Sequence, residues 1–168
     1  MNIKKLRGLW DRFFEYDRIA ERKIIKSIRL WNGGVISKIH SMFLYNRIRK
    51  VYGCSINPRI RLGEDFYISH AQDIVIGQTS EIGDRCRVYP GAKVIAKVEG
   101  DMELIKKGMR RHPKIGNDCI LGADCIVIGP INVGNNVTIA AGAICTKDVP
   151  DNCMVIGINI IKVKRGIA

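Results

Sequence analysis

The chain changes its hydrophobic periodicity near Gly53. Before this point, large apolar side chains recur at the three- and four-residue spacing of an amphipathic helix, and Asn32-Gly33-Gly34 interrupts them. Glycine pairs end helices, and Gly53 ends the second apolar run in the same way. The pattern therefore predicts two consecutive helices, one within residues 1–31 and one from Ile36 to Val51.

The second predicted helix contains one of the three histidines of the chain. His40 lies beside Ile36, Ile39 and Phe43 on the helical pattern. We interpret it as a packing histidine and assign it no chemistry.

From Ile56 onward, an aliphatic residue recurs at every sixth position, a period that matches neither a helix nor simple strand alternation. The first run is Ile56, Leu62 and Ile68. The second, offset by two residues, is Ile76, Ile82, Val88 and Val94, and the third is Ile115, Leu121, Val127, Val133 and Ile139, with Cys145 continuing it. The fifth position of a hexad is small or β-branched, as in Ser80, Cys86, Ala92, Cys119, Cys125, Ile131, Val137 and Ala143. A period of six predicts one short strand and one turn per repeat, with both positions pointing inward.

Three such strands make a triangular coil, and stacked coils bury continuous ladders of aliphatic side chains. We therefore expect a mainly β fold at residues 53–168, preceded by a basic amphipathic helical segment at residues 1–52. The repeat is interrupted at residues 100–114, which are polar and basic. We expect this interruption to project from the coils as an inserted loop.

The composition suits one soluble domain with a hydrophobic core, because 46% of the 168 residues are hydrophobic and 26% are charged. No apolar run approaches the roughly 18 residues that a membrane-spanning helix needs, and the first residues form no signal-like apolar stretch. We therefore expect a cytoplasmic protein. The six cysteines form no Cys-x-x-Cys pair, so we interpret them as reduced thiols, of which Cys86, Cys119 and Cys125 are small interior fillers.

The net charge of +12 is concentrated at the start of the chain, where residues 1–52 hold 13 basic and 4 acidic side chains. This asymmetry is typical of a segment with an anionic partner, and also of a solvated helical face. One alternative is peripheral contact of residues 1–30 with the inner face of the membrane, with Trp10, Phe13 and Phe14 in the interface. The other is packing of these aromatic residues on the coils or on another subunit. We do not expect nucleic-acid binding, because no stacking motif or recognised module is present.

The two remaining histidines both lie where the six-residue register breaks. His70 precedes a two-residue offset of the repeat, and His112 lies at the end of the interruption. Loops inserted into a rigid scaffold often carry function, and histidine has a pKa suited to removing a hydroxyl proton near pH 7. Both histidines are therefore candidates for catalysis.

Residues 54 to about 165 resemble the hexapeptide-repeat acyltransferases, whose fold is a left-handed parallel β-helix. Residues 54–112 look like the serine acetyltransferase branch of that family. The resemblance rests on the segments Ile56-Asn57-Pro58, Ile68-Ser69-His70, Ile74-Val75-Ile76-Gly77-Gln78-Thr79 and Arg111-His112-Pro113-Lys114-Ile115. The short chain and its N-terminal helix pair are similar to the acetyltransferases of capsule and exopolysaccharide synthesis.

The resemblance implies an acetyl-CoA-dependent O-acetyltransferase that uses no metal. His70 then acts as general base on the acceptor hydroxyl, which attacks the thioester directly. His112 contacts the acceptor, and Arg111 pairs with an acceptor carboxylate. Because active sites of this family form between subunits, the resemblance also implies a homotrimer.

Two carboxylates of the serine acetyltransferase branch are missing, since their positions fall at Ser55 and Ser69. Ser55, Asp73 or a backbone carbonyl must then orient the second nitrogen of His70. Without the carboxylate at position 69, a substrate ammonium loses its partner, so a neutral hydroxyl such as that of a sugar becomes the favoured acceptor. The predicted acceptor-binding residues are Arg111, Ser69 and Asp73.

In the family, the pantetheine arm of the coenzyme lies in a groove between neighbouring coils of adjacent subunits, where small residues let it approach the backbone. The matching residues here are Gly122, Ala123, Ala140 and Ala141. Basic residues of the C-terminal segment could pair with the coenzyme phosphates, namely Lys162, Lys164 and Arg165. Turn packing and a solvated tail are the alternative interpretations of these two groups.

Three functional hypotheses follow from these observations. The favoured one is an O-acetyltransferase acting on a sugar in surface polysaccharide (capsule, O-antigen or exopolysaccharide) biosynthesis. The alternative is a serine O-acetyltransferase of cysteine biosynthesis. A hypothesis of another class is a non-catalytic trimeric β-helix scaffold in which His70 and His112 are idle. A γ-type carbonic anhydrase is rejected, because it needs three zinc-binding histidines and the repeat region has two.

Overall fold

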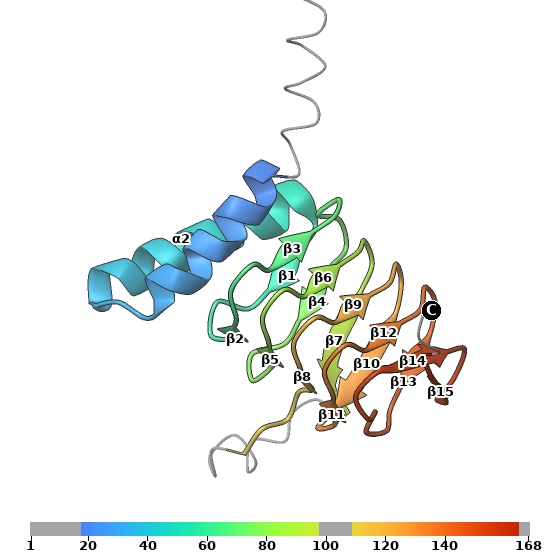
Figure 1. Cartoon of the computed structure of the whole chain (residues 1–168). Coiled ribbons are helices and arrows are strands. Elements are labelled where there is room, and N and C mark those ends of the chain that lie inside the picture. Colours follow the sequence, from blue (N-terminus) through green and yellow to red (C-terminus); the bar gives the residue numbers. More distant parts are fainter. Residues whose placement is uncertain (1–17, 98–108, 165–168) are drawn as a thin grey trace, which may run out of the picture.

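A computed structural model describes residues 18–97 and 109–164, which form a helical hairpin followed by a stack of triangular coils (Figure 1). The first helix occupies residues 18–31, and α2 (Val35–Tyr52) returns antiparallel to it. The pair of helices and the glycines between them agree with the prediction. Within these described residues, neither helix is long and apolar enough to cross a membrane.

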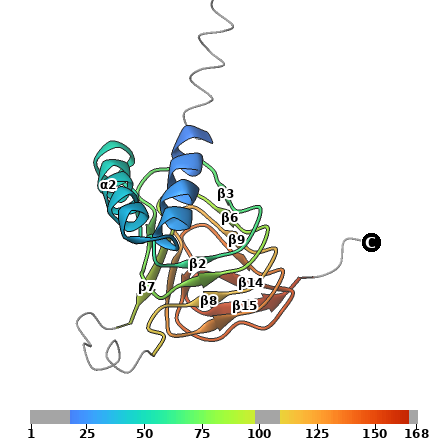
Figure 2. The ribbon, with the colours of Figure 1, turned by 90° about the vertical axis from the view of Figure 1, so that its left-hand side faces the viewer.

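Each coil contributes one strand to each of three sheets, which form the sides of a triangular prism (Figure 2). The five-stranded sheet contains β1 (Ser55–Ile56), β4 (Val75–Ile76), β7 (Lys93–Ala96), β10 (Ile126–Gly129) and β13 (Ile144–Cys145). The four-stranded sheet contains β2 (Arg61–Leu62), β5 (Glu81–Ile82), β8 (Lys114–Ile115) and β11 (Asn132–Val133). The six-stranded sheet contains β3 (Tyr67–Ile68), β6 (Arg87–Val88), β9 (Ile120–Leu121), β12 (Thr138–Ile139), β14 (Cys153–Ile156) and β15 (Ile160–Val163).

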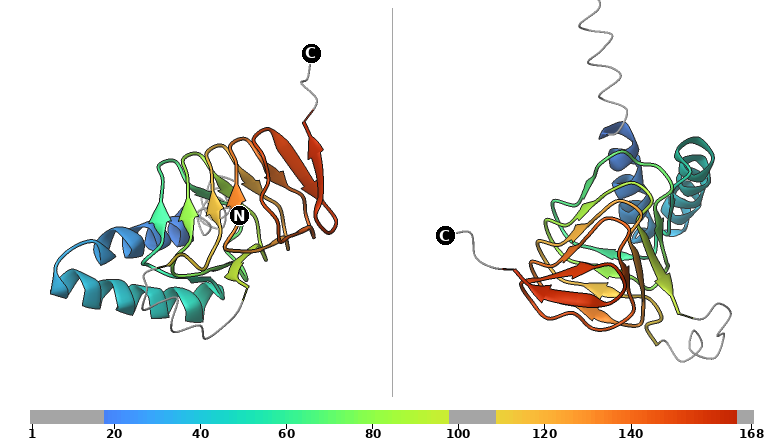
Figure 3. Two further views of the ribbon diagram at one scale, coloured as in Figure 1. Left: turned by 90° about the horizontal axis from the view of Figure 1, so that it is seen from below. Right: turned by 90° about the vertical axis from the view of Figure 1, so that its right-hand side faces the viewer.

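The predicted aliphatic ladders run through the three sheets in perfect register. Neighbouring strands are parallel, apart from the antiparallel β14–β15 pair that closes the far end of the stack (Figure 3). The three ladders are Ile56-Ile76-Val94-Val127-Cys145, Leu62-Ile82-Ile115-Val133 and Ile68-Val88-Leu121-Ile139-Val155. All members except Leu62 are buried. The six-residue period therefore predicted the inward side chains correctly.

The six cysteines are free and buried, and for Cys86, Cys119 and Cys125 the position in the repeat predicted this burial. Burial raises the pKa of the Cys125 thiol to about 12, so this thiol stays protonated at neutral pH. The Cys86 and Cys119 thiols donate hydrogen bonds to the carbonyls of Gly116 and Gly134 in the next coil, each at 3.1 Å. Cysteine here packs the interior and also links adjacent coils.

A ladder of amide and carboxylate side chains holds the corner between the four-stranded and six-stranded sheets. The Oδ1 atoms of Asp84, Asn117 and Asn135 accept the backbone N–H groups of Glu64, Asp84 and Asn117, each at 2.9 Å. Asp151 continues the ladder by accepting the N–H of Asn135 at 2.7 Å. These bonds satisfy turn backbone groups that have no partner within a strand. This corner is structural, and the sequence pattern did not single it out.

The hairpin is held by two small polar residues, Ser27 and Ser41, at the contact between its two helices. The Ser27 hydroxyl donates to the Ser41 carbonyl at 3.1 Å, and the Ser41 hydroxyl donates to the Ser27 carbonyl at 2.7 Å. Both serines are buried, and Ile24 and Ile48 pack beside them in the same core that continues into the coils. Gly53 ends α2 in a left-handed conformation, with φ of 65° and its N–H bonded to the Arg49 carbonyl.

The interpretation of His40 as a packing residue is wrong for this chain. His40 is exposed, and so are Ile36 and Ile39 beside it, with exposed fractions of 85% and 64%. The side of α2 that packs on the first helix is the opposite one, which carries Ser41 and Ile48. The apolar residues around His40 follow helical spacing on an outer face, and sequence periodicity does not tell an inner face from an outer one.

The ladder arrangement predicts that substitutions at the two positions of β9 lower the free energy of unfolding by very different amounts. Leu121→Ala should lower the free energy of unfolding by about 2–5 kcal/mol, because Leu121 is fully buried and the rigid coils close little of the cavity. Ile120→Ala, at the adjacent outward-facing position, should lower the free energy of unfolding much less. Urea denaturation of both variants measures the difference, and equal losses would contradict the inward–outward alternation.

Candidate active site

The predicted histidines lie at opposite edges of the five-stranded sheet. His70 lies in the turn that leads from β3 into β4, and the His112 ring lies over Gly77, directly after β4. The extended stretch Ile74–Gly77 between them is about 10 Å long at roughly 3.3 Å per residue. Within one chain, the two histidines therefore belong to two different corners of the prism.

A single threonine holds the His112 side chain. The Thr79 hydroxyl oxygen lies 2.8 Å from His112 Nδ1, and the Thr79 backbone N–H donates to the same nitrogen at 3.3 Å. The hydroxyl oxygen also accepts the backbone N–H groups of Arg111 and His112, at 3.0 and 3.2 Å. Because it accepts from both backbone groups, the hydroxyl is left to donate its own proton to Nδ1.

These contacts fix the tautomer of the neutral His112 ring. Nδ1 faces two donors, one of which is a backbone N–H that cannot accept, so the ring proton must be on Nε2. Burial lowers the pKa of His112, and the charge of Arg111 lowers it further. His112 is therefore neutral near pH 7 and presents an Nε2–H donor.

Gly77 is required for this placement of the ring. A Cβ atom at position 77 would overlap the Nε2 and Cδ2 atoms of His112. The glycine of the Ile76-Gly77 step therefore serves the histidine directly. Thr79 and Gly77 both lie in the motif that carries the family resemblance, but the sequence analysis gave neither of them a role.

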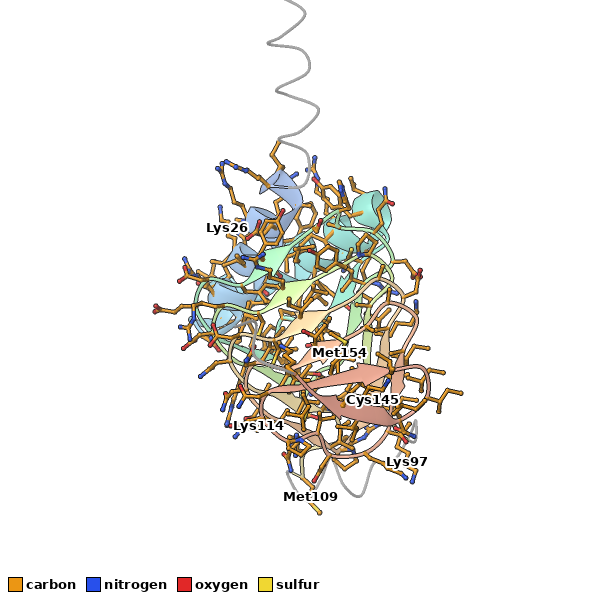
Figure 4. All side chains as sticks on the ribbon, turned by 45° about the vertical axis from the view of Figure 1, so that its right-hand side comes forward. Lys26, Lys97, Met109, Lys114, Cys145 and Met154 are labelled. Carbon is orange, nitrogen blue, oxygen red and sulfur yellow. The ribbon has the colours of Figure 1, made fainter. Side chains whose placement is uncertain are left out.

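Arg110 fixes the chain directly before the Arg111-His112 pair. Its guanidinium group donates to the carbonyl of Ile131 at 2.9 Å and to Asn132 Oδ1 at 2.7 Å. Pro113 packs against Gly129, which precedes a cis peptide bond to Pro130. Lys97 and Met109, on the two sides of the predicted loop, lie toward the lower edge of the coil stack in Figure 4. Residues 98–108, most of that loop, lie outside the described residues.

His70 is exposed and has a left-handed backbone with φ of 50°. The two candidate side chains for orienting it are both engaged with other residues. The Ser55 hydroxyl lies 3.0 Å from the Tyr45 hydroxyl of α2, and the Asp73 carboxylate forms an ion pair with Lys93 at 2.9 Å. Ser69 opens instead into a groove on the outer side of the six-stranded sheet, which is lined by Asp65, Tyr67, Ser69, Arg85, Arg87, Tyr89, Asp118 and Ile120.

The four small residues predicted to contact coenzyme lie on the same corner as His70. Gly122 and Ala123 follow β9, and Ala140 and Ala141 follow β12, so all four occupy the turns that stack above the His70 turn. A Cβ atom at Gly122 would lie 2.6 Å from the Ala141 nitrogen, and the Gly142 N–H bonds to the Ala123 carbonyl at 2.8 Å. The structure thus brings His70 and these residues together along one edge.

Of the basic C-terminal residues that the structure describes, Lys164 does not lie at the His70 corner with these small residues. Lys162 is exposed in β15, and Lys164 reaches the opposite edge of the six-stranded sheet, where its Nζ donates to Asn136 Oδ1 at 2.9 Å. Lys164 is therefore not brought beside Gly122 and Ala140 within one chain. Arg165 lies outside the described residues, as do Trp10, Phe13 and Phe14.

Residues 112–147 match the family model of the bacterial transferase hexapeptide, with six repeats. This part of the chain consists of transferase hexapeptide repeats. The chain is also similar to serine acetyltransferases. That of Synechococcus elongatus is 37% identical over 110 residues, which cover 66% of this chain and 42% of the relative. That of Mycobacterium tuberculosis is 33% identical over 129 residues, which cover 77% of this chain and 52% of the relative. The chain therefore spans about half the length of these curated relatives.

Solved structures agree with the sequence comparisons. The serine acetyltransferase of Neisseria gonorrhoeae in complex with serine superposes with a TM-score of 0.71 at 31% identity, covering 85% of this chain and 54% of that one. The soybean serine acetyltransferase apoenzyme gives a TM-score of 0.72 at 27% identity, with coverages of 88% and 57%. The predicted left-handed parallel β-helix with an N-terminal helical segment is thereby confirmed.

The tautomer of His112 can be measured directly. We expect a ¹⁵N-labelled chain to show His112 as the neutral Nε2–H tautomer at pH 7, with a pKa below its ordinary value of about 6.5. Thr79→Val should weaken this preference, because it removes the hydroxyl donor, whereas Thr79→Ser should retain it. A dominant Nδ1–H tautomer in the unsubstituted chain would contradict the hydrogen bonding described here.

Proposed function

We propose that the chain is an acetyl-CoA-dependent O-acetyltransferase with L-serine as its acceptor. The observation that carries this proposal is the Thr79-held Arg111-His112 pair on a β-helix that is similar in sequence and fold to serine acetyltransferases. The sequence analysis favoured a sugar acceptor in polysaccharide biosynthesis. The comparisons lend no support to a polysaccharide enzyme and favour the serine alternative.

The proposed reaction is a direct transfer between two bound substrates. His70 takes the proton of the acceptor hydroxyl, and the oxygen forms a bond to the thioester carbonyl carbon of acetyl-CoA. The carbon–sulfur bond then breaks, and the coenzyme thiolate recovers the proton from His70, so that the products are the O-acetyl ester and free coenzyme A.

The two histidines have different proposed roles because their surroundings differ. The Nδ1 atom of His112 is occupied by Thr79, so this ring offers an Nε2–H to an acceptor oxygen and does not serve as the base. His70 lies on the exposed edge that also carries Gly122 and Ala140, where the pantetheine arm would place its thioester. The base is therefore assigned to His70, and the guanidinium of Arg111 is assigned to the serine carboxylate.

The site we propose needs two chains. His70 and His112 project from different corners of one prism, so a reaction that uses both requires the His70 corner of one chain beside the His112 corner of its neighbour. A closed ring of three chains repeats this contact three times, which agrees with the homotrimer that the family resemblance implies.

An uncharged hydroxyl acceptor is the second candidate, and one observation favours it. Ser55 and Ser69 stand where the resemblance expects carboxylates, and Asp73 is paired with Lys93. An amino group on the acceptor then has no obvious carboxylate partner among these three residues. An assay of which acceptor the protein acetylates therefore decides between serine and a sugar.

Release of coenzyme thiol from acetyl-CoA in the presence of L-serine tests the proposed activity. We expect serine-dependent release, and we expect His70→Asn to lower kcat/KM by about 10²–10⁴-fold, because it removes the general base. Size-exclusion chromatography of the variant serves as the folding control. Release with a panel of sugars but not with serine would establish the second candidate. An unchanged rate in both His70→Asn and His112→Asn would overturn the catalytic assignment of these residues. No release with serine or with any sugar would leave the non-catalytic scaffold.

Mixed oligomers test the two-chain site. The His70→Asn and His112→Asn variants should each be inactive, but co-expression in equal amounts should restore about one quarter of the unsubstituted activity, because one contact in four then pairs two intact histidines. Co-expression of His70→Asn with a differently tagged copy of itself is the matched control. Failure of the mixed sample to gain activity, with mixed oligomers verified by the two tags, would contradict a site shared between chains.

A further inference from the structure

The outer face of α2 exposes five large apolar side chains. Their exposed fractions are 76% for Val35, 85% for Ile36, 64% for Ile39, 53% for Met42 and 66% for Phe43. At 3.6 residues per turn, these positions fall within an arc of about 120°. We call them the α2 outer face.

This face is separate from the packing of the fold. The side of α2 that contacts the first helix carries Ser41, Ile48 and Tyr52, which are buried. The α2 outer face points the opposite way, and the hairpin extends beyond the first coil at the end of the stack away from β15 (Figures 1 and 3). Its apolar residues therefore contribute nothing to the core of a single chain.

Exposure of this kind is costly in water. Burying one side chain of this type is favourable, so several together amount to a substantial driving force for association. Contiguous apolar patches on soluble proteins usually mark interaction surfaces. The α2 outer face is therefore expected to bind a partner, and the charge of the surrounding residues indicates the chemistry of that partner.

The hairpin that carries this face is strongly basic. Residues 18–53 hold nine lysines and arginines against a single acidic residue, Glu21. Within α2 itself the charged residues are all basic, and they flank or follow the apolar positions: Lys38, Arg47, Arg49 and Lys50. Lys26 projects from the first helix in the same part of the molecule (Figure 4).

We propose that the α2 outer face binds the surface of an anionic lipid bilayer. Apolar side chains enter the boundary between headgroups and acyl chains, while long basic side chains extend from the flanks to the lipid phosphates. Each lysine or arginine near such a surface adds to the electrostatic attraction. A helix with an apolar face bordered only by basic charges meets both requirements.

A second copy of the chain fits this face less well. Pairing two outer faces would bring two hairpins against each other, each with an excess of eight positive charges over residues 18–53 and with Glu21 as its single acidic residue. An anionic bilayer relieves the same charge that opposes self-association. The proposal concerns α2 and does not depend on the acetyl transfer proposed above.

Vesicle flotation of the full chain tests the proposal. We expect the chain to float with vesicles of phosphatidylglycerol and phosphatidylcholine, to stay unbound with pure phosphatidylcholine, and to be released by high salt. The triple variant Ile36→Ser, Ile39→Ser, Phe43→Ser should bind at least about tenfold more weakly, because it removes most of the apolar surface that enters the bilayer.

The matched control carries Ile158→Ser and Val163→Ser at the other end of the coil stack. These side chains are 67% and 75% exposed and lie near Lys162 and Lys164, so this control also removes exposed apolar surface among basic residues. It should bind vesicles like the unsubstituted chain. Circular dichroism establishes that both variants are folded.

Light scattering in the absence of lipid gives the other decisive readout. The triple variant should keep the oligomeric mass of the unsubstituted chain. A lower mass would show that the face joins copies of the chain and would overturn the proposal. Failure of the full chain to float with anionic vesicles, or full binding by the triple variant, would also overturn it.

Discussion

The structure depends on the in-register stacking of aliphatic side chains inside the coils. Each rung, such as Val88-Leu121-Ile139, is formed by residues of adjacent coils, so no single coil has a core of its own. The rungs fix where every turn lies, because a strand of two residues leaves little room for a shift in register. Corners that are far apart in sequence are therefore brought together along straight edges of the prism.

The edges of the prism determine where the residues of the candidate site lie. One edge stacks the His70 turn with the small residues Gly122 and Ala140, and another carries His112 over Gly77. The rigid coils keep the two edges apart within a chain, which is why the proposed chemistry needs a neighbour. Thr79 fixes the protonation state of the His112 ring, since it makes His112 an Nε2–H donor, and the proposed role of base then falls to His70.

The sequence predicted the coils, the inward ladders and the buried cysteines, because a six-residue period constrains side-chain direction at every repeat. It also located both histidines at breaks in the repeat. It missed Thr79, because one hydroxyl that accepts two backbone N–H groups and donates to a ring is a three-dimensional arrangement with no periodic signature. It misplaced His40, because helical spacing does not distinguish an inner face from an outer one. The pairing of Lys164 with coenzyme phosphates stays a prediction, since Lys164 lies across the sheet from Gly122 within one chain.

The central claim is that acetyl transfer takes place between two corners contributed by neighbouring chains. A crystal structure of the assembled protein with coenzyme A and L-serine tests it most directly. The account predicts the coenzyme sulfur and the serine hydroxyl between His70 of one chain and the His112 ring of the next, with the pantetheine arm along Gly122 and Ala140. Coenzyme bound along another edge, or contacts to both histidines from a single chain, would contradict it.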